Sequence, residues 1–401
     1  MDAFLVFFAT MILVSLIIPK MGPFLSLVVA AILFGLLVGM GQELMGYMAT
    51  GLGRIFSSLA IVVFSGALLA EYLRRTGAID RIIADLGGLA HQSLLVSGAA
   101  GYLVSLPVMC SITAYMILEP VVRGLGNAGD GASKRALFMT AVCTIISFNL
   151  IYPSPVMVSL SGSFGVKPYD LLVTCIPISL VLFALAYIIL LLLPGKEARI
   201  AQIPIPKVSR ARAWAPLSLP LVLILQGGLW EGAKMLADPG IALLMGSLLG
   251  LALEKEMMHD LIHVASRRSG VILLDLCGAG AFGSVVAHSF LGKEIYHLGQ
   301  FLPVLVLPFL ISAVLQLAQG SRVVTAVVAA EILADYPLDG VTLALLVAAG
   351  AFMFSYISDP YFWLIKNSTG SSMKETALGY TLPLSILGLA AFGLAAVSSM
   401  L

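Results

Sequence analysis

The chain has 401 residues, of which 60% are hydrophobic and 11% are charged, and its formal net charge is +1. Soluble globular domains carry about 25% charged residues, so this composition excludes a soluble domain and predicts a polytopic membrane protein. The small net charge, with no basic run outside the central loop, excludes nucleic-acid binding.

Several apolar runs are long enough to cross about 30 Å of hydrocarbon. They lie at residues 3–19, 22–40, 55–71, 170–193, 213–230, 239–253, 269–291 and 377–398. The first run follows Asp2 rather than a basic region and lacks a small-residue cleavage site, which favours a transmembrane span over a signal peptide.

Four further apolar stretches are interrupted by polar residues, glycine or proline. The two that are too long for one span, and that we predict to be re-entrant hairpins, are 92–122 and 300–334. The two that we predict to be broken helices are 136–168 and 341–376. The interruptions lie at Pro107, Gln319–Arg322, Tyr152–Pro155 and Ser358–Pro360. Backbone freed at such breaks finds no water in the hydrocarbon core, so we expect it inside the protein or along a wet cavity.

The interrupted stretches of the two halves share residues in the same order. Gly66, Ala67, Thr113, Ala114 and Glu119 recur at one common offset as Gly278, Ala279, Thr325, Ala326 and Glu331. Such internal repeats are typical of secondary transporters. We predict two transmembrane repeats, 1–193 and 215–401, joined by a cytoplasmic linker at 194–214.

The basic residues predict the orientation. If each hairpin enters and leaves on one side, most Lys and Arg fall on the cytoplasmic side, as the positive-inside rule requires. The outer segments then carry only Arg54, Lys167, Lys234 and Lys293. The first repeat starts outside and the second inside, so the sequence predicts an all-α membrane protein with inverted repeats, about ten spans and two hairpins.

Arg322 lies at the middle of the second predicted hairpin. A central intramembrane arginine costs about 2.5–3.5 kcal/mol on insertion scales, so it should face a cavity and have a partner. One hypothesis is that its guanidinium binds a substrate carboxylate beside the amides of Gly320 and Ser321. The alternative is a structural ion pair with Asp275 or Glu331.

Asp359 lies on the second predicted break. A carboxylate on unwound backbone can take a proton or join other oxygens around a sodium ion, which makes Asp359 the first candidate for ion coupling. The alternative, which is compatible with coupling, is that Asp359 caps a helix that begins at Pro360. Asp275 is the second candidate for coupling.

The remaining candidate substrate contacts are polar side chains on the four interrupted stretches. They are Gln319, Thr325, Ser358, Asn367, Thr369, Ser111, Thr113, Asn149, Tyr152 and Ser154. Hydroxyl groups in membrane helices usually bond their own backbone, so each favours a structural role by itself, and only the cluster favours a site.

The remaining motifs predict helix packing or do not indicate a functional site. Gly278 and Gly280 are expected to allow close helix packing. His259 and His263 have the spacing of a metal pair, but they lie in a predicted charged loop without a third ligand. We expect no metal site and no cofactor.

Four short motifs carry a resemblance to a known transporter family. They are Cys277–Phe282, Ala318–Ser321, Ser355–Trp363 and Tyr152–Pro155. They resemble Gly-Ala-Gly-Gly-Ala-Phe, Ala-Gln-Gly-Ser, Ser-His-Val-Asn-Asp-Ser-Gly-Phe-Trp and Pro-Pro-His-Pro of the gluconate permease family, within the ion-transporter superfamily. Tyr356, Ser358 and Ser154 replace a histidine, an asparagine and a second histidine of that family, which leaves the substrate open.

The resemblance implies a symporter of sugar acids or hydroxycarboxylates, driven by protons or sodium, in the plasma membrane. It also implies a homodimer that works by alternating access. A carboxylate transporter with a different substrate is the alternative. An anion channel would need a continuous polar pore, and a membrane enzyme would need an acid, base or metal constellation, so we expect neither.

Overall fold

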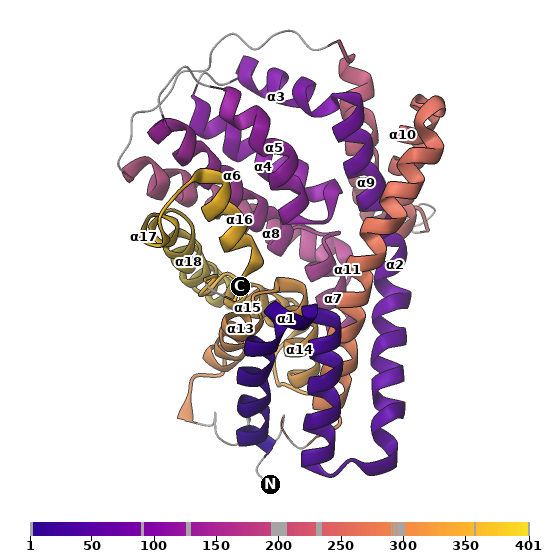
Figure 1. The fold of residues 1–401 in the computed structure, drawn as a ribbon, viewed down its shortest axis with the longest axis vertical. Coiled ribbons are helices and arrows are strands. Elements are labelled where there is room, and N and C mark those ends of the chain that lie inside the picture. Colours follow the sequence, from indigo (N-terminus) through magenta and orange to yellow (C-terminus); the bar gives the residue numbers. More distant parts are fainter. Residues whose placement is uncertain are drawn as a thin grey trace.

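A computed structural model describes residues 3–89, 92–125, 130–193, 207–229, 235–289, 291, 294, 301–356 and 358–399. The described residues form helices and no β-strand, which confirms the all-α prediction (Figure 1). Six of the helical stretches are long and apolar enough to cross a membrane.

The first half contains α1 (Ala3–Val38), α2 (Leu44–Thr76), α3 (Ala78–Leu89), α4 (Ser93–Val108), α5 (Ser111–Gly124), α6 (Asp130–Leu150), α7 (Pro155–Phe164) and α8 (Pro168–Leu192). The second half contains α9 (Arg210–Leu229), α10 (Pro239–Leu253), α11 (Met258–Ala287), α13 (Val306–Gln319), α14 (Arg322–Ile332), α15 (Gly340–Gly350), α16 (Pro360–Thr369), α17 (Met373–Thr376) and α18 (Leu382–Ser398). A π turn, Ala377–Thr381, joins α17 to α18. The predicted linker falls partly outside the described residues, and its last five residues, 210–214, belong to α9.

The two apolar runs at the start of the chain form two arms of α1, which reverses direction at Gly22 (φ 75°). The rings of Phe7 and Phe34 lie 6.3 Å apart. In a straight helix these residues would be about 40 Å apart, so the arms must lie side by side. The second arm then leads into α2, as Figure 1 shows.

The helices α2 and α11 run side by side and are about 50 and 45 Å long (Figure 1). They meet at two glycines: a Cβ atom on Gly51 would lie 2.1 Å from the carbonyl oxygen of Gly280, and one on Gly280 would lie 2.5 Å from that of Gly51. A Cβ atom on Gly278 would lie 3.1 Å from the backbone of Phe24 in α1. These contacts confirm that Gly278 and Gly280 serve close helix packing.

The start of α11 differs from the sequence prediction. His259 and His263 lie in the first turns of the helix and are exposed, not in a loop. The helix begins early because Leu261 and Ala265, one turn apart, are buried against Leu68 of α2 and neighbouring residues. The amphipathic helix α3 was also not predicted.

Both predicted hairpins are helix-turn-helix units with similar tips. The first turns at Met109 and Cys110, and the second at Gly320 and Ser321; the first residue of each turn has a left-handed conformation and the second is extended. The longest arm, α4, has 16 residues, or about 24 Å, which is less than the thickness of the hydrocarbon core. The arms are therefore too short to cross a bilayer alone. Their re-entrant position stays a prediction.

Both predicted breaks are present. The helix α6, buried among α4, α5 and α8, ends at Leu150 and the chain resumes as α7; α15, packed against α13 and α18, ends at Gly350 and the chain resumes as α16. The short helix α7 packs against α14, and Tyr115 of α5 packs against Tyr361 of α16. Each hairpin thus contacts the short helix of the other half, while the division into repeats stays a prediction.

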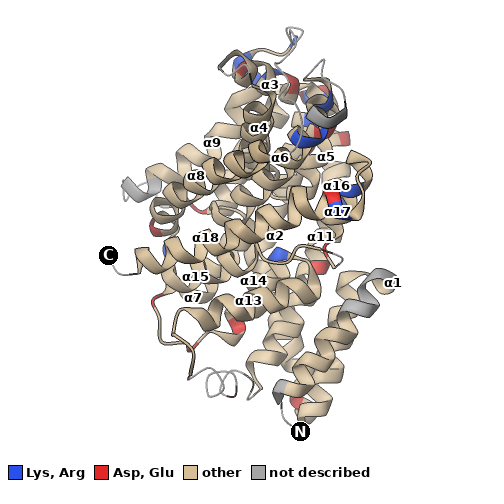
Figure 2. Cartoon of the chain, turned by 90° about the vertical axis from the view of Figure 1, so that its left-hand side faces the viewer, with Lys and Arg blue, Asp and Glu red and all other residues tan. Residues whose placement is uncertain are grey.

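A polar cluster joins α3 to α9 at one end of the molecule. The carboxylate of Asp85 accepts hydrogen bonds from Trp214 Nε1 and Arg210 Nε, both at 3.0 Å. In Figure 2 the basic residues in view lie mostly near α3 and α5 or beside α16 and α17, and few lie near α1. This distribution fits the predicted orientation, although Lys234 and Lys293 lie outside the described residues.

The glycine crossing gives a stability prediction. Gly51→Ala should lower the thermal unfolding midpoint in detergent by about 2–10 °C, because the added Cβ must push α2 away from α11. Gly53→Ala is the matched control on the same helix, since nothing lies within 4 Å of its Cβ position. Equal midpoints for the two variants would contradict the close crossing.

The cluster around Asp85 gives a pH prediction. Burial acts to raise the pKa of Asp85, but the hydrogen bonds from Trp214 and Arg210 and the charges of Arg210 and Arg81 outweigh it, so the pKa is lowered. The stabilisation is therefore complete above the ordinary value of about 3.9 and is lost as the pH falls through the lowered pKa. Fluorescence of Trp214, taken as the difference from Trp214→Phe, should titrate below about pH 3.9. Asp85→Asn should abolish that transition, and a midpoint at or above the ordinary value would refute the assignment.

Candidate functional site

The second break, the tip of the second hairpin and the π turn meet at one buried junction. Gly320 has a φ of 68°, and a Cβ atom on it would lie 2.1 Å from the carbonyl oxygen of Ser358. Both the left-handed backbone and this contact require glycine. The Ser358 hydroxyl donates to the carbonyl of Leu317 at 2.6 Å, so the hairpin tip and the break are held together.

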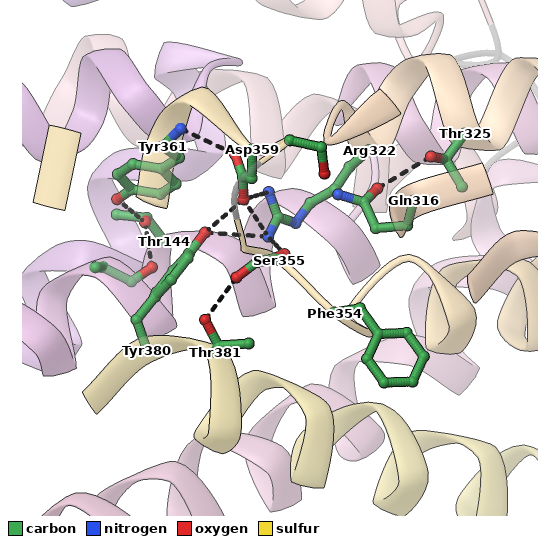
Figure 3. A network of polar contacts seen from close by, with 12 residues as sticks. Thr144, Gln316, Arg322, Thr325, Phe354, Ser355, Asp359, Tyr361, Tyr380 and Thr381 are labelled. Atoms are coloured by element: carbon green, nitrogen blue, oxygen red, sulfur yellow. Dashed lines mark hydrogen bonds and ion pairs between the residues drawn. The ribbon is translucent and has the colours of Figure 1, made fainter. Parts of the chain in front are cut away.

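Arg322, the first residue of α14, is 5% exposed and lies at the centre of this junction (Figure 3). Its Nη2 donates to Ser355 Oγ at 2.6 Å and to the Tyr380 hydroxyl at 3.1 Å. Nη1 and Nη2 each lie 3.4 Å from Asp359 Oδ2, and Nε has no hydrogen-bond partner among the described residues. Tight charge-assisted bonds measure about 2.7–2.9 Å, so this pair is loose and leaves guanidinium donors for another carboxylate.

Asp359 caps α16 and pairs with Arg322. Its Oδ1 accepts the backbone N–H of Tyr361 at 2.9 Å, and Pro360 is the first residue of the helix, which confirms the capping interpretation. Its Oδ2 accepts the Tyr380 hydroxyl at 3.0 Å. At 1% exposure the carboxylate is buried among hydrogen-bond donors.

Two helix N-termini also lie at the junction. Arg322 begins α14 and Pro360 begins α16, so the positive ends of both helix dipoles lie at this point. Ser321, the N-cap of α14, makes no side-chain cap, which leaves the N–H groups of that first turn without side-chain acceptors. Two helix dipoles and one arginine favour an anion here.

Sequence reasoning missed several residues of the junction. Besides Ser355 and Tyr380, these are the neighbours Tyr361 and Thr144, whose hydroxyl groups are 2.8 Å apart, and Gln316, which accepts a hydrogen bond from Thr325 at 3.0 Å. The rings of Tyr115, Tyr361 and Tyr380 form consecutive edge contacts from α5 to the π turn. The available signal was a set of hydroxyl groups inside apolar runs, because a buried Tyr hydroxyl needs a partner.

The structure corrects both predicted ion-pair partners of Arg322. Arg322 pairs with Asp359, not with Asp275 or Glu331. Glu331 instead pairs with Arg54 of α2. Asp275 accepts the backbone N–H of Phe24 at 3.2 Å, where it caps the second arm of α1 after its reversal.

The other predicted residues make contacts away from the guanidinium. Thr325 stays within its hairpin, and Gln319 Nε2 contacts Met11 Sδ at 3.3 Å. Asn367 is exposed and Thr369 bonds its own helix; both lie near the far end of α16, about 12–15 Å from Asp359. The structure therefore does not bring Asn367, Thr369 or Asp275 to Arg322.

The candidates of the first half occupy the corresponding hairpin and break. Asn149 donates to the carbonyl of Ala348 at 2.6 Å and so joins the ends of α6 and α15. Ser154 caps α7, Ser111 begins α5, and the N–H of Thr113 lies 3.5 Å from Cys110 Sγ. The fifth residue, Tyr152, is buried in the break. Ser111, the first residue of α5, corresponds to Arg322, and Ser154, the cap of α7, corresponds to Asp359. The first half therefore carries no charge at these two positions.

No group of three His, Cys, Asp or Glu that could hold a metal ion occurs among the described residues. Long apolar helices, short hairpins and broken helices around a buried polar junction are features of membrane transport proteins. The sequence profile of the GntP family permeases matches residues 1–208 and 221–401. The chain belongs to this permease family, and it is a multi-pass transport protein of the plasma membrane, not an enzyme.

Similar proteins agree with this assignment. An uncharacterised permease of Haemophilus influenzae is 25% identical, with 98% of this chain and 90% of the relative covered. The low-affinity gluconate transporter of Escherichia coli strain K12 is 25% identical over 92% of this chain and 91% of its own. The crystal structure of the YdaH transporter of Alcanivorax borkumensis, a protein of unusual topology, matches with a TM-score of 0.58 at 16% identity, covering 90% of this chain and 87% of that one. That likeness concerns the fold alone.

The buried ion pair gives a stability prediction. Arg322→Met or Asp359→Asn alone leaves one buried charge unpaired and should destabilise the protein by about 3–5 kcal/mol, whereas the double variant should lose much less than the sum. Thermal unfolding in detergent measures this cycle. The exposed pair of Arg123 and Glu119 on α5, joined at 2.6 Å, is the control, and its coupling should stay below about 1 kcal/mol. Additive effects at Arg322 and Asp359 would contradict a coupled pair.

Proposed function

We propose that this chain is a secondary active transporter of small carboxylates, such as gluconate or another sugar acid or hydroxycarboxylate. It moves the anion together with a proton or a sodium ion by alternating access. The observation that carries the proposal is the buried Arg322, which is loosely paired and lies where two helix N-termini meet; in the described part of the chain its Nε has no hydrogen-bond partner. Family membership supports transport, and the E. coli relative suggests gluconate as the first substrate to test.

In this proposal Arg322 binds the substrate carboxylate. The guanidinium fork can hold a carboxylate through two parallel hydrogen bonds. The backbone of Gly320 and Ser321 at the hairpin tip approaches the same place, and unbonded N–H groups of the first turn of α14 add donors. Hydroxyl groups of a sugar acid would find partners among the serine, threonine and tyrosine side chains of the junction.

Asp359 is the proposed coupling residue. It is the acid that the structure pairs with Arg322, and it sits on unwound backbone beside the substrate position. A cation taken up there would compensate the charge that the substrate brings.

The structure favours a carrier over a channel. Arg322 and Asp359 are almost fully buried in a compact junction, and a channel would expose such groups along a continuous polar path. The residues that depart from the family motifs make structural contacts here. The ring of Tyr356 makes an edge contact with that of Phe362, with 4.9 Å between the centroids, Ser358 bonds the hairpin, and Ser154 caps a helix. A panel of carboxylates therefore belongs in the first screen.

We also propose that residues 1–193 and 215–401 are inverted repeats and that the protein is a homodimer. Matching caps support the repeats. Ser154 and Asp359 cap helices that begin with Pro155 and Pro360, and those helices end at left-handed glycines. The dimer rests on the family resemblance.

The first test is transport by purified protein in proteoliposomes. Labelled gluconate should exchange in a counterflow assay and accumulate under an imposed pH or sodium gradient. Arg322→Ala should raise the half-saturating gluconate concentration by about 10- to 100-fold, because a charged hydrogen bond contributes about 1.5–3 kcal/mol. Arg123→Ala, an exposed arginine on α5, is the matched control and should behave as wild type. Normal gluconate affinity in Arg322→Ala would refute the binding role.

A further inference from the structure

Tyr380 lies in a π turn, which is a rare local structure and occurs often at functional sites. Successive residues of an α-helix point about 100° apart. Here two successive residues reach the same break: the Tyr380 hydroxyl donates to Asp359 Oδ2 at 3.0 Å, and Thr381 Oγ1 donates to the carbonyl of Ser355 at 2.6 Å. Figure 3 shows both side chains directed at this segment. The π turn therefore presents Tyr380 to the ion pair.

The Tyr380 hydroxyl bridges the two charges. Its single proton is donated to Asp359, and its oxygen accepts from Arg322 Nη2 at 3.1 Å. If Asp359 gains a proton, that acid can donate to the same phenol oxygen, which then no longer needs the donor of Arg322. One hydrogen bond reverses its direction, and the guanidinium is released for another acceptor.

The charges at the junction sum to zero. Arg322 faces Asp359 from α14, Tyr380 faces it from the π turn, and Tyr361 follows it on α16; the two phenols are neutral. Among the described residues, Asp359 forms an ion pair with Arg322 alone. A carboxylate bound at Arg322 would add one uncompensated negative charge to a buried site, which is strongly unfavourable. One proton on Asp359 restores neutrality.

The surroundings of Asp359 favour a proton over sodium. Its Oδ1 faces the N–H of Tyr361, and its Oδ2 faces the donors of Arg322 and Tyr380. A metal cation needs several oxygen acceptors around it, whereas these neighbours present hydrogen atoms. A proton needs one acceptor, which the Tyr380 oxygen supplies.

Building on the proposed function, we propose that the substrate carboxylate replaces Asp359 on Arg322 while Asp359 takes one proton and donates it in a hydrogen bond to Tyr380. A monovalent carboxylate then crosses with one proton, and the transport step moves no net charge. The reverse order releases the anion, returns the proton to water and restores the ion pair. Tyr380 is the positioning residue of this exchange.

Proteoliposomes that contain wild-type protein and a trapped pH dye test the stoichiometry. Uptake of labelled gluconate should carry one proton per anion and should not respond to a potential imposed with potassium and valinomycin. A ratio other than one, or uptake accelerated by the potential, would overturn this inference while transport itself stands. Absence of counterflow with every carboxylate of the panel would instead overturn the proposed function, and the inference with it.

Two variants test the residues. Asp359→Asn keeps the cap acceptor and cannot titrate, so gluconate uptake by this variant should no longer respond to an imposed pH gradient. Tyr380→Phe removes a donor to the ionised carboxylate, so the pH of half-maximal uptake should rise by about one unit. Tyr361→Phe is the matched control: its ring packs on Tyr380 at 5.6 Å, but its hydroxyl bonds Thr144. It should leave the pH profile unshifted.

A purely structural role for Tyr380 would lower the maximal rate without moving the pH profile. If Asp359→Asn is unstable in detergent, the role of Tyr380 can still be tested by comparing the pH dependence of gluconate uptake in Tyr380→Phe with that in Tyr361→Phe. An unshifted profile in Tyr380→Phe, or proton-driven accumulation in Asp359→Asn, would refute the exchange.

Discussion

The ion pair between Arg322 and Asp359 is the interaction on which the junction depends. Each of these two charges would be costly alone in the interior of a membrane protein. Together they hold the first turn of α14, the cap of α16 and the π turn in one place, because Tyr380 bonds both. The hairpin tip, the break and the last helix therefore form one polar unit inside an apolar protein.

The pair does not have the geometry that stability alone would select. Its distances of 3.4 Å are long, and no described residue bonds the Nε of Arg322. A buried pair of this kind is often less stabilising than apolar residues of the same volume. Its loose geometry fits the proposed exchange, in which Arg322 releases Asp359 and binds the carboxylate of the substrate.

The two halves use similar backbone devices with different chemistry. Both hairpins turn through a left-handed residue, and both breaks end at a serine or aspartate cap followed by proline. Only the second half places charges at these positions. The first half contributes Tyr115 and Thr144, which contact Tyr361, the residue that follows Asp359 and Pro360 on α16. Beside these elements, the glycine contact brings the backbones of α2 and α11 close together.

The sequence by itself determined the membrane class, the hairpins and breaks, and the cap at Asp359. These features depend on composition, on proline and glycine, and on residues close together in the chain. Only the tertiary structure decided the partner of Arg322, because Asp275 and Asp359 are far from it in sequence and Glu331, nine residues away on the same helix, pairs with Arg54 instead. It also decided that Asp275 caps α1 and that Tyr380 joins the site, since tertiary packing brings the π turn back to the break. The sequence shows that a buried charge such as Arg322 needs a partner, but the fold determines which residue is that partner.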